Sequence, residues 1–235
     1  MLKIQNLTKK YGKDFLAVND LSLTVNAGEI YGFIGHNGAG KSTTIKSIVG
    51  ALDFDGGEIF IGGNSIKSQP IDCKKITAYI PDNPDIYDHL TGEQYINFIC
   101  DIFEVKENRN ELIKKYSDEF ELTQNLGDLI SSYSHGMKQK LVIISALVHS
   151  PKLLILDEPF VGLDPLASHK LKTIMREFCE GGGAIFFSSH VLEVVEKLCD
   201  RVGIIKEGKL VKEGTVAEIA GDKSLENLFL EIQNG

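Results

Sequence analysis

The segment Gly35-His36-Asn37-Gly38-Ala39-Gly40-Lys41-Ser42 decides the fold of this chain. It matches a phosphate-binding pattern, in which a glycine and four further residues precede Gly-Lys-Ser. The strand-like run Ile30–Ile34 comes before it and a helix-like stretch from Lys41 to Val49 follows it, which is the context that the pattern needs. A plain glycine-rich turn rarely has both flanks. The segment therefore predicts a nucleoside triphosphate site.

The residues of this loop have different expected contacts with the nucleotide. Glycines let the backbone curl so that successive amide groups point at phosphate oxygens. Lys41 adds a positive charge beside the β- and γ-phosphates, and the Ser42 hydroxyl can ligate Mg²⁺. The N-terminus of the following helix faces the anion, where its dipole favours negative charge. The expected nucleotide-binding residues are Gly35, His36, Asn37, Gly38, Ala39, Gly40, Lys41, Ser42 and Thr43.

A second motif, Leu153-Leu154-Ile155-Leu156-Asp157-Glu158-Pro159, places two carboxylates after an apolar run. The four consecutive apolar residues predict a short strand buried on both faces, as in a parallel sheet. At its end Asp157 can hold Mg²⁺ through water. Glu158 is expected to point to the opposite side and to polarise a water for attack on the γ-phosphate. Asp-Glu-Pro by itself is common where a strand ends. The motif therefore indicates a role in nucleotide chemistry only because the chain also contains the phosphate-binding loop.

A third motif, Ser134-His135-Gly136-Met137-Lys138-Gln139, precedes the apolar stretch Leu141–Val148. It predicts a helix with Ser134 near its N-cap and Gly136 allowing close backbone approach. The free amide donors at its start would make a second anion site, and an ordinary capped core helix is the alternative. With Leu-Leu-Ile-Leu-Asp-Glu-Pro shortly after it, Tyr133-Ser-His-Gly-Met-Lys-Gln-Lys resembles the signature motif of ATP-binding-cassette (ABC) ATPases. The resemblance spans nearly the whole chain.

The resemblance implies roles for residues outside the phosphate-binding loop. Tyr11 in Lys-Lys-Tyr-Gly resembles the aromatic residue that stacks on adenine, although ordinary packing would also explain it. Gly162-Leu163-Asp164-Pro165 resembles the D-loop at the dimer interface, and His190 in Phe-Phe-Ser-Ser-His resembles the switch histidine that contacts the γ-phosphate. Ser134 and Gly136 resemble the signature pair that contacts phosphate across the dimer.

The chain departs from the family pattern at two places. The signature has Tyr133-Ser134-His135-Gly136-Met137 where the family usually has Leu-Ser-Gly-Gly-Gln, but it keeps the phosphate-contacting serine and glycine. Asp82, within Tyr79–Pro84, occupies the place of a glutamine that touches Mg²⁺ and senses the membrane partner. A carboxylate can ligate Mg²⁺ directly or through water, and a solvated turn aspartate is the other interpretation. Both departures resemble the cassettes that drive ABC-2-type exporters.

We expect an α/β fold with a P-loop nucleotide-binding core, an N-terminal antiparallel β subdomain and an inserted helical subdomain. Alternation predicts strands over most of the first ~30 residues and over residues 57–62. Thr91-Gly92-Glu93-Gln94 resembles a capping box that opens a helix with a wide apolar face. Residues 1–235 would form a single ABC ATPase domain, with the helical subdomain at approximately 85–145. A later hairpin is expected to turn at Glu207-Gly208.

The composition limits the possible partners. With 235 residues, 43% of them hydrophobic, the chain can bury a sizeable core. Its net charge of −8 argues against a nucleic-acid partner. No apolar run is long enough to span a bilayer, and the N-terminal segment lacks the apolar stretch of a signal peptide. Cys73, Cys100, Cys179 and Cys199 lack Cys-x-x-Cys spacing, so we expect reduced thiols in a cytosolic protein rather than a metal site.

The resulting hypothesis is an ATPase subunit at the cytoplasmic face of the membrane, bound to a transmembrane permease and powering export. ATP and Mg²⁺ would lie between two ATPase subunits, in a homodimer or a heterodimer, and Lys41, Glu158 and His190 would carry catalysis. The expected permease contacts are Pro84, Ile86 and Tyr87. Two alternatives stay open: a soluble ABC ATPase that remodels a ribosome or nucleic-acid complex, and a regulatory module that barely hydrolyses ATP.

Overall fold

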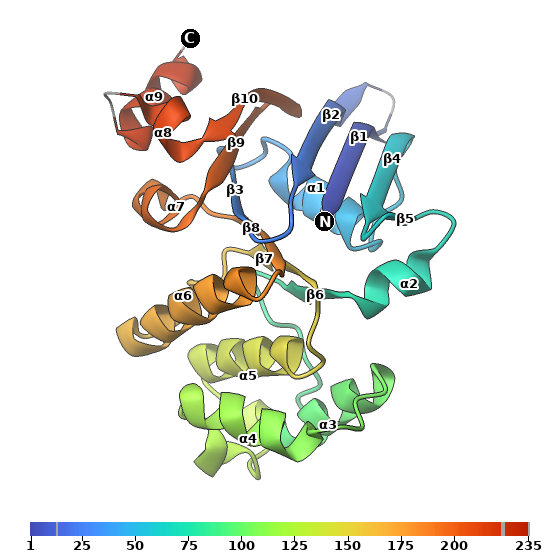
Figure 1. Ribbon diagram of the computed structural model, residues 1–235, viewed down its shortest axis with the longest axis vertical. Coiled ribbons are helices and arrows are strands. Elements are labelled where there is room, and N and C mark those ends of the chain that lie inside the picture. Colours follow the sequence, from blue (N-terminus) through green and yellow to red (C-terminus); the bar gives the residue numbers. More distant parts are fainter. Residues whose placement is uncertain (13, 222–223, 235) are drawn as a thin grey trace.

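The computed structural model describes residues 1–12, 14–221 and 224–234. Within these ranges the strands form two sheets, and helices pack around the second sheet and beyond it (Figure 1). The predicted α/β fold with an antiparallel sheet beside the nucleotide core is confirmed.

Alternating apolar residues build the first sheet. In β1 (Leu2–Tyr11), Leu2 and Ile4 are buried and Lys3 is exposed, because successive side chains of a strand point to opposite faces. The pairing register shifts between Ile4 and Leu7, where Asn6 has a φ of 50°, so that Leu7 returns to the buried face. The sheet is antiparallel, in the order β2-β1-β4-β5, and its other strands are β2 (Phe15–Val25), β4 (Gly56–Ile61) and β5 (Asn64–Ser65).

The second sheet contains the strands that surround the phosphate-binding loop. β3 (Ile30–Ile34), β7 (Leu153–Asp157) and β8 (Ala184–Ser188) are buried along their whole length, as expected of parallel strands that are covered on both faces. The other strands are β6 (Thr77–Ile80), β9 (Arg201–Lys206) and β10 (Lys209–Thr215). The order is β10-β9-β3-β8-β7-β6, with only β10 antiparallel to its neighbour among the described strands. The predicted hairpin turn at Glu207-Gly208 is confirmed.

The strand order brings three loops to one edge of this sheet. β8 lies between β3 and β7, with Ser188 opposite both Phe33 and Asp157. The carboxyl ends of parallel strands share an edge, and ligands bind outside that edge in open α/β sheets. The segments that follow β3, β7 and β8 therefore lie side by side.

A group of helices lies at the opposite end of the molecule from the first sheet (Figure 1). The predicted capping box is confirmed, because Thr91 accepts from the Gln94 backbone and Gln94 accepts from the Thr91 backbone. The predicted subdomain boundaries near 85 and 145 stay a prediction. The helices of this group are α3 (Gly92–Ile102), α4 (Arg109–Glu119) and α5 (His135–Leu147), with short 3₁₀ helices at Thr123–Asn125 and Ile130–Ser132.

Each face of the second sheet has its own buried core. Ile30 and Ile34 of β3 belong to one apolar cluster, while Tyr31 and Phe33 belong to the other. All four cysteines of the sequence are buried free thiols. Among the described residues, no helix combines the length and the apolar character that crossing a membrane requires. The remaining helices are α1 (Lys41–Ile48), α2 (Pro70–Lys75), α6 (Pro165–Glu180), α7 (Leu192–Leu198), α8 (Val216–Ala220) and α9 (Leu225–Asn234).

Candidate functional site

The phosphate-binding loop joins the end of β3 to the start of α1. Gly40 has a φ of 110°, and a Cβ at this position would collide with the carbonyl oxygen of Ala17. Only glycine therefore fits there. Gly38 also has a positive φ, of 82°, and faces open space. Because these glycines carry no side chains, the backbone of the loop is accessible at the N-terminus of α1, where binding of an anion is favoured.

Lys41 folds back over this loop. Its Nζ donates to the carbonyl oxygens of Gly35 at 2.5 Å and His36 at 3.2 Å. Burial lowers the pKa of Lys41, and the negative charges of Glu158 and Asp157 oppose that shift. The ammonium group is therefore held beside the acidic end of the site, where a phosphate oxygen could replace the two carbonyl acceptors.

Most of the predicted nucleotide site surrounds one cavity of about 290 Å³. Ala39, one of the predicted residues, is instead buried beneath the loop. Phe15 and Ala17 line the cavity without having been predicted. The lining residues are Tyr11, Phe15, Ala17, His36, Asn37, Gly38, Gly40, Lys41, Ser42, Thr43, Asp82, Asp157 and Glu158.

Two aromatic side chains stand at one end of this cavity. Tyr11 is 43% exposed and Phe15 is 60% exposed, and their Cα atoms are partners at the end of the β1–β2 pairing. Lys9 Nζ lies 5.6 Å from the centre of the Tyr11 ring. The pairing of Phe15 with Tyr11 across the hairpin is the signal by which sequence analysis could have found Phe15.

Asp157 and Glu158 enter the same cavity from the end of β7. Asp157 is buried and accepts a hydrogen bond from the Ser188 hydroxyl. Burial raises the pKa of Asp157, and the Ser188 hydrogen bond opposes that rise. Glu158 lies beyond the strand and has a φ of 48°. The expectation that it points to the opposite side from Asp157 was wrong, because strand alternation ends before it and both residues line the cavity.

His190 contacts Glu158 directly. The distance between His190 Nδ1 and Glu158 Oε1 is 2.8 Å, and the Ser189 hydroxyl donates to Glu158 Oε2 at 3.3 Å. These residues line a second cavity of about 430 Å³ that adjoins the first one through His36, Asn37 and Glu158. Its other lining residues are Gly35, Leu192 and Phe229.

The signature segment lies apart from both cavities. Ser134 caps α5, because its hydroxyl oxygen accepts a hydrogen bond from Met137 N at 3.2 Å. Ser134 is exposed. Of the described residues that line the two cavities, none belongs to the segment 133–139. Gly136 packs against the D-loop, because a Cβ there would lie 2.7 Å from Gly162 O. The predicted contact of Ser134 and Gly136 with a nucleotide held by another subunit stays a prediction.

Oxygen atoms suited to Mg²⁺ gather in the first cavity. Ser42, Asp82 and Asp157 all line it, and hydroxyl and carboxylate oxygens are the ligands that Mg²⁺ prefers. Among the described residues, no group of three or more His, Cys, Asp or Glu side chains could hold a metal on its own. Mg²⁺ is commonly bound by one or two carboxylates together with substrate phosphates. The donor set therefore fits Mg²⁺ bound with ATP.

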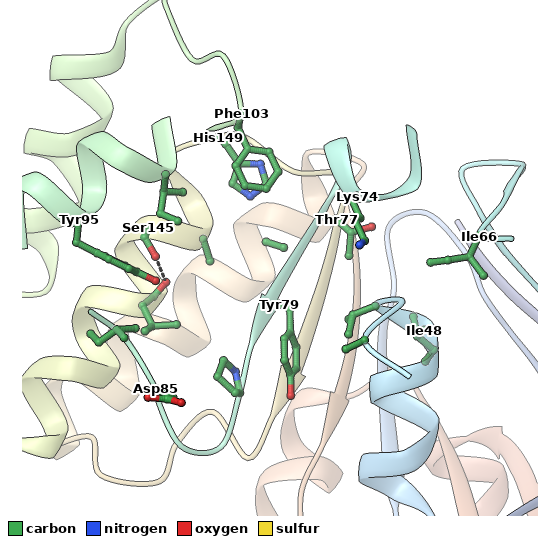
Figure 2. Close-up of a pocket in the computed structure, with 18 residues that line it drawn as sticks. Ile48, Ile66, Lys74, Thr77, Tyr79, Asp85, Tyr95, Phe103, Ser145 and His149 are labelled. Atoms are coloured by element: carbon green, nitrogen blue, oxygen red, sulfur yellow. Dashed lines mark hydrogen bonds between the residues drawn. The ribbon is translucent and has the colours of Figure 1, made fainter. Parts of the chain in front are cut away.

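A third cavity, of about 400 Å³, separates the nucleotide core from the helical group. Figure 2 shows Tyr95 and Ser145 on one side of it and Ile48 and Ile66 on the other, with Tyr79 between them. Its walls are mainly apolar. The 18 residues come from α1, α2, β6, α3, α5 and the connecting segments (Figure 2).

His149 and Phe103 form the end of this cavity. Their rings are stacked with centroids 3.8 Å apart, and Figure 2 shows them lying face to face. Burial lowers the pKa of His149 from 6.5 to about 4. Among the described residues, no hydrogen-bond partner reaches its buried Nδ1. The imidazole is therefore neutral near pH 7.

The surface next to this cavity carries part of the predicted permease contact. Tyr87 is 51% exposed and its ring meets Phe98 edge-on, with centroids 5.7 Å apart. Ile86 lines the cavity. Pro84 is buried while Asn83 and Asp85 on either side of it are exposed, so its selection as a surface contact was wrong.

Comparison with known proteins identifies the family. A family model described as ABC transporter matches residues 18–161. The chain belongs to the ABC transporter family, as an ATP-binding subunit. ATP-binding domains of this family are ATPases.

Relatives within the family match almost the whole chain. The ABC-type transporter ATP-binding protein EcsA of Bacillus subtilis is 34% identical over 238 residues, which cover 99% of this chain and 96% of that protein. The lantibiotic transport ATP-binding protein SrtF of Streptococcus pyogenes is 38% identical over 229 residues, covering 97% and 96%. A solved ATP-binding subunit of an ABC transporter is 34% identical, with a TM-score of 0.95 and 99% of each chain covered.

Proposed function

We propose that this chain is the ATP-hydrolysing subunit of a membrane exporter and that it works as a dimer. The observation that carries the proposal is the meeting of Glu158, His190 and the phosphate-binding loop at two adjoining cavities. The similarity to SrtF, whose name describes lantibiotic transport, supports export. The names of the relatives give no support to ribosome or nucleic-acid remodelling.

ATP would lie with its adenine against Tyr11 and its phosphates along the loop. Lys41 Nζ would exchange its contacts with Gly35 and His36 for oxygens of the β- and γ-phosphates. Such charge-assisted hydrogen bonds are roughly twice as strong as neutral ones. The γ-phosphate would then be next to Glu158, on the side of the second cavity.

Hydrolysis would proceed by attack of water on the γ-phosphorus. Glu158 would orient this water and accept its proton, the new P–O bond would form, and the bond to the bridging oxygen would break to leave ADP and phosphate. His190 would hold the γ-phosphate in line. Ser42, Asp157 and Asp82 would hold Mg²⁺, which neutralises charge on the phosphate oxygens when bound. Catalysis is then mostly positioning and charge stabilisation.

A second ATPase subunit would complete the site. Ser134 and Gly136 lie away from the cavities of their own chain, and helix N-termini bind phosphate through free amide groups. We therefore place the signature of one subunit over the nucleotide of the other. The γ-phosphate would join the two subunits, and its removal would let them separate.

The permease would dock at the third cavity and the surface beside it. Tyr87, Phe98 and Ile102 are exposed apolar residues, and such a group beside an apolar cavity is typical of a protein interaction surface. The chain would thereby be held at the cytoplasmic face of the membrane. Asp82 lies in the segment between this surface and the nucleotide, so it could link the two.

Binding of a permease can be tested with one substitution and one control. Tyr87→Glu should prevent co-purification of the chain with a multi-span membrane protein from detergent extracts, and should abolish stimulation of ATP hydrolysis by that protein in vesicles. Val211→Glu changes a similarly exposed apolar residue on β10 and should leave both unchanged. Equal loss in both variants, or stimulation that survives Tyr87→Glu, would contradict the docking surface.

A further inference from the structure

α9 forms part of the wall of the cavity that contains Glu158 and His190. Its residue Phe229 lines this cavity together with Leu192 of α7. Leu192 follows His190 by only two positions. A residue about 40 positions further along the chain thus reaches the segment that holds the switch histidine, and neither the phosphate-binding loop nor the signature accounts for its presence.

The segment around His190 depends on its neighbours for its position. His190 lies between the end of β8 and the start of α7, which spans only Leu192–Leu198. Val191 at the N-cap provides no side-chain hydrogen bond. Helices this short are not stable by themselves, and packing holds them in place. α7 packs against β3 on one side and α9 on the other.

α9 is itself firmly attached to the nucleotide core. Leu225 is fully buried, and Leu228, Phe229 and Ile232 pack against the larger apolar cluster. The Lys206 Nζ donates to Ile232 O at 2.8 Å, which ties α9 to the end of β9. The turn that follows β9 supports the phosphate-binding loop, because Gly208 N donates to Ala39 O at 2.9 Å. α9 therefore contacts α7, next to His190, on one side. On the other side it contacts the end of β9, which is followed by the turn that supports the phosphate-binding loop.

We propose that Phe229 is a positioning residue for His190. Packed in the wall beside Leu192, its ring holds the segment 189–192 so that His190 stays in contact with Glu158. The inference rests on the proposed catalytic roles of Glu158 and His190. Because Phe229 does not line the cavity that would hold the nucleotide, its removal acts on turnover and leaves ATP binding intact.

The substitution Phe229→Ala tests this role. It removes the ring from the cavity wall and allows α7 to shift. We therefore expect kcat to fall on the order of tenfold, which is less than the typical contribution of a general acid–base group. The KM for ATP should stay within twofold of the wild-type value. Phe229→Leu keeps an apolar side chain of similar reach and should restore most of kcat. Leu230→Ala changes the adjacent residue, which is 51% exposed, and should behave as wild type.

A double-mutant cycle with His190→Ala separates positioning from general stability. If Phe229 acts through His190, then Phe229→Ala lowers kcat in the wild type and adds little to the loss already caused by His190→Ala. A merely structural role would lower kcat by the same factor in both backgrounds. Thermal unfolding of each variant shows whether the fold is retained, and Phe229→Leu keeps the test valid if the alanine variant is unstable.

The possible outcomes distinguish this inference from the proposed function. Loss of turnover in His190→Ala with unchanged turnover in Phe229→Ala would overturn the positioning role alone. Full turnover in His190→Ala would overturn the catalytic assignment beneath it. Equal losses in Phe229→Ala and Leu230→Ala, or a parallel loss of ATP affinity, would also overturn the positioning role.

Discussion

His190 Nδ1 lies 2.8 Å from Glu158 Oε1, so one nitrogen of the imidazole is engaged by the carboxylate and Nε2 is the nitrogen that remains for a phosphate oxygen. With Nδ1 donating to Glu158, Nε2 can donate only when the ring carries both protons. The contact therefore places the imidazole directly against the carboxylate that would activate water. This geometry makes the two residues a functional unit whose effects on turnover should not be additive.

Lys41→Ala should weaken ATP binding. The substitution removes a charged donor from the phosphates, and a hydrogen bond to a charged group contributes about 1.5–3 kcal/mol, which corresponds to a loss of affinity of roughly 10- to 150-fold. Titration calorimetry with ATP measures the change. Lys46→Ala, at an exposed position of the same helix, is the control, and equal affinities of the two variants would refute the role of Lys41.

Asp82→Asn should show how Asp82 meets the metal. If Asp82 acts through water, the amide keeps an acceptor oxygen, so ATP affinity should change little while stimulation by the permease changes. If Asp82 is a direct ligand, the Mg²⁺ concentration for half-maximal hydrolysis should rise, since a hard cation favours a charged oxygen. Hydrolysis rates are measured against Mg²⁺ with and without the permease.

The exposed Asp53 provides the matched control Asp53→Asn for this series. The control should follow the wild-type curve in every condition. Curves for Asp82→Asn that also coincide with wild type would show that Asp82 neither binds Mg²⁺ nor senses the permease.

Gly162→Ala should destabilise the contact between the D-loop and the signature helix. Gly162 has a φ of 81°, and a Cβ there would collide with the His135 ring. A side chain in this conformation costs at least about 1 kcal/mol, so the free energy of unfolding in urea should fall. Gly127→Ala, where a Cβ meets open space, is the control. A Gly162→Ala protein as stable as wild type would argue against this contact.

His149 should make the protein less stable in acid. Its folded pKa of about 4 lies below the ordinary value of 6.5, so the unfolded chain binds the proton first. The free energy of unfolding then decreases as the pH falls from about 6.5 to 4, by at most about 1.4 kcal/mol per pH unit from this group. His149→Gln should reduce that slope in urea titrations at several pH values.

An exposed histidine provides the control for the measured pH dependence of the free energy of unfolding. His169→Gln, at an exposed position, should leave the slope of the wild type unchanged. The role of His149 fails if its variant keeps the full slope, or if both variants reduce it equally.

Some features of the fold and site follow directly from local sequence. The spacing of the glycines, Lys41 and Ser42 predicted the loop between β3 and α1, because phosphate binding requires these residue types in this order. The apolar run before Asp157 predicted a buried parallel strand for the same kind of reason. The capping box at Thr91 also depends on neighbours only three residues apart.

Other features depend on contacts between distant segments. Phe229 reaches the cavity that contains Glu158 and His190 only because α9 packs against α7, and nothing in its local sequence indicates that contact. Glu158 departs from strand alternation, where its backbone N donates to Ser188 O at 3.2 Å. Pro84 is buried although Asn83 and Asp85 on either side of it are exposed. Local patterns cannot specify such long-range packing.

The most direct test of the account is Glu158→Gln measured by sedimentation with and without Mg²⁺-ATP. The amide cannot accept the proton of the attacking water, so the variant should bind ATP, lose nearly all turnover and accumulate as a dimer joined by uncleaved γ-phosphates. Ser134→Arg, which places bulk at the signature contact, should abolish that dimer in the same background. A Glu158→Gln protein that stays monomeric at saturating ATP would contradict dimerisation through the γ-phosphate, and one that hydrolyses ATP at the wild-type rate would contradict the catalytic role of Glu158.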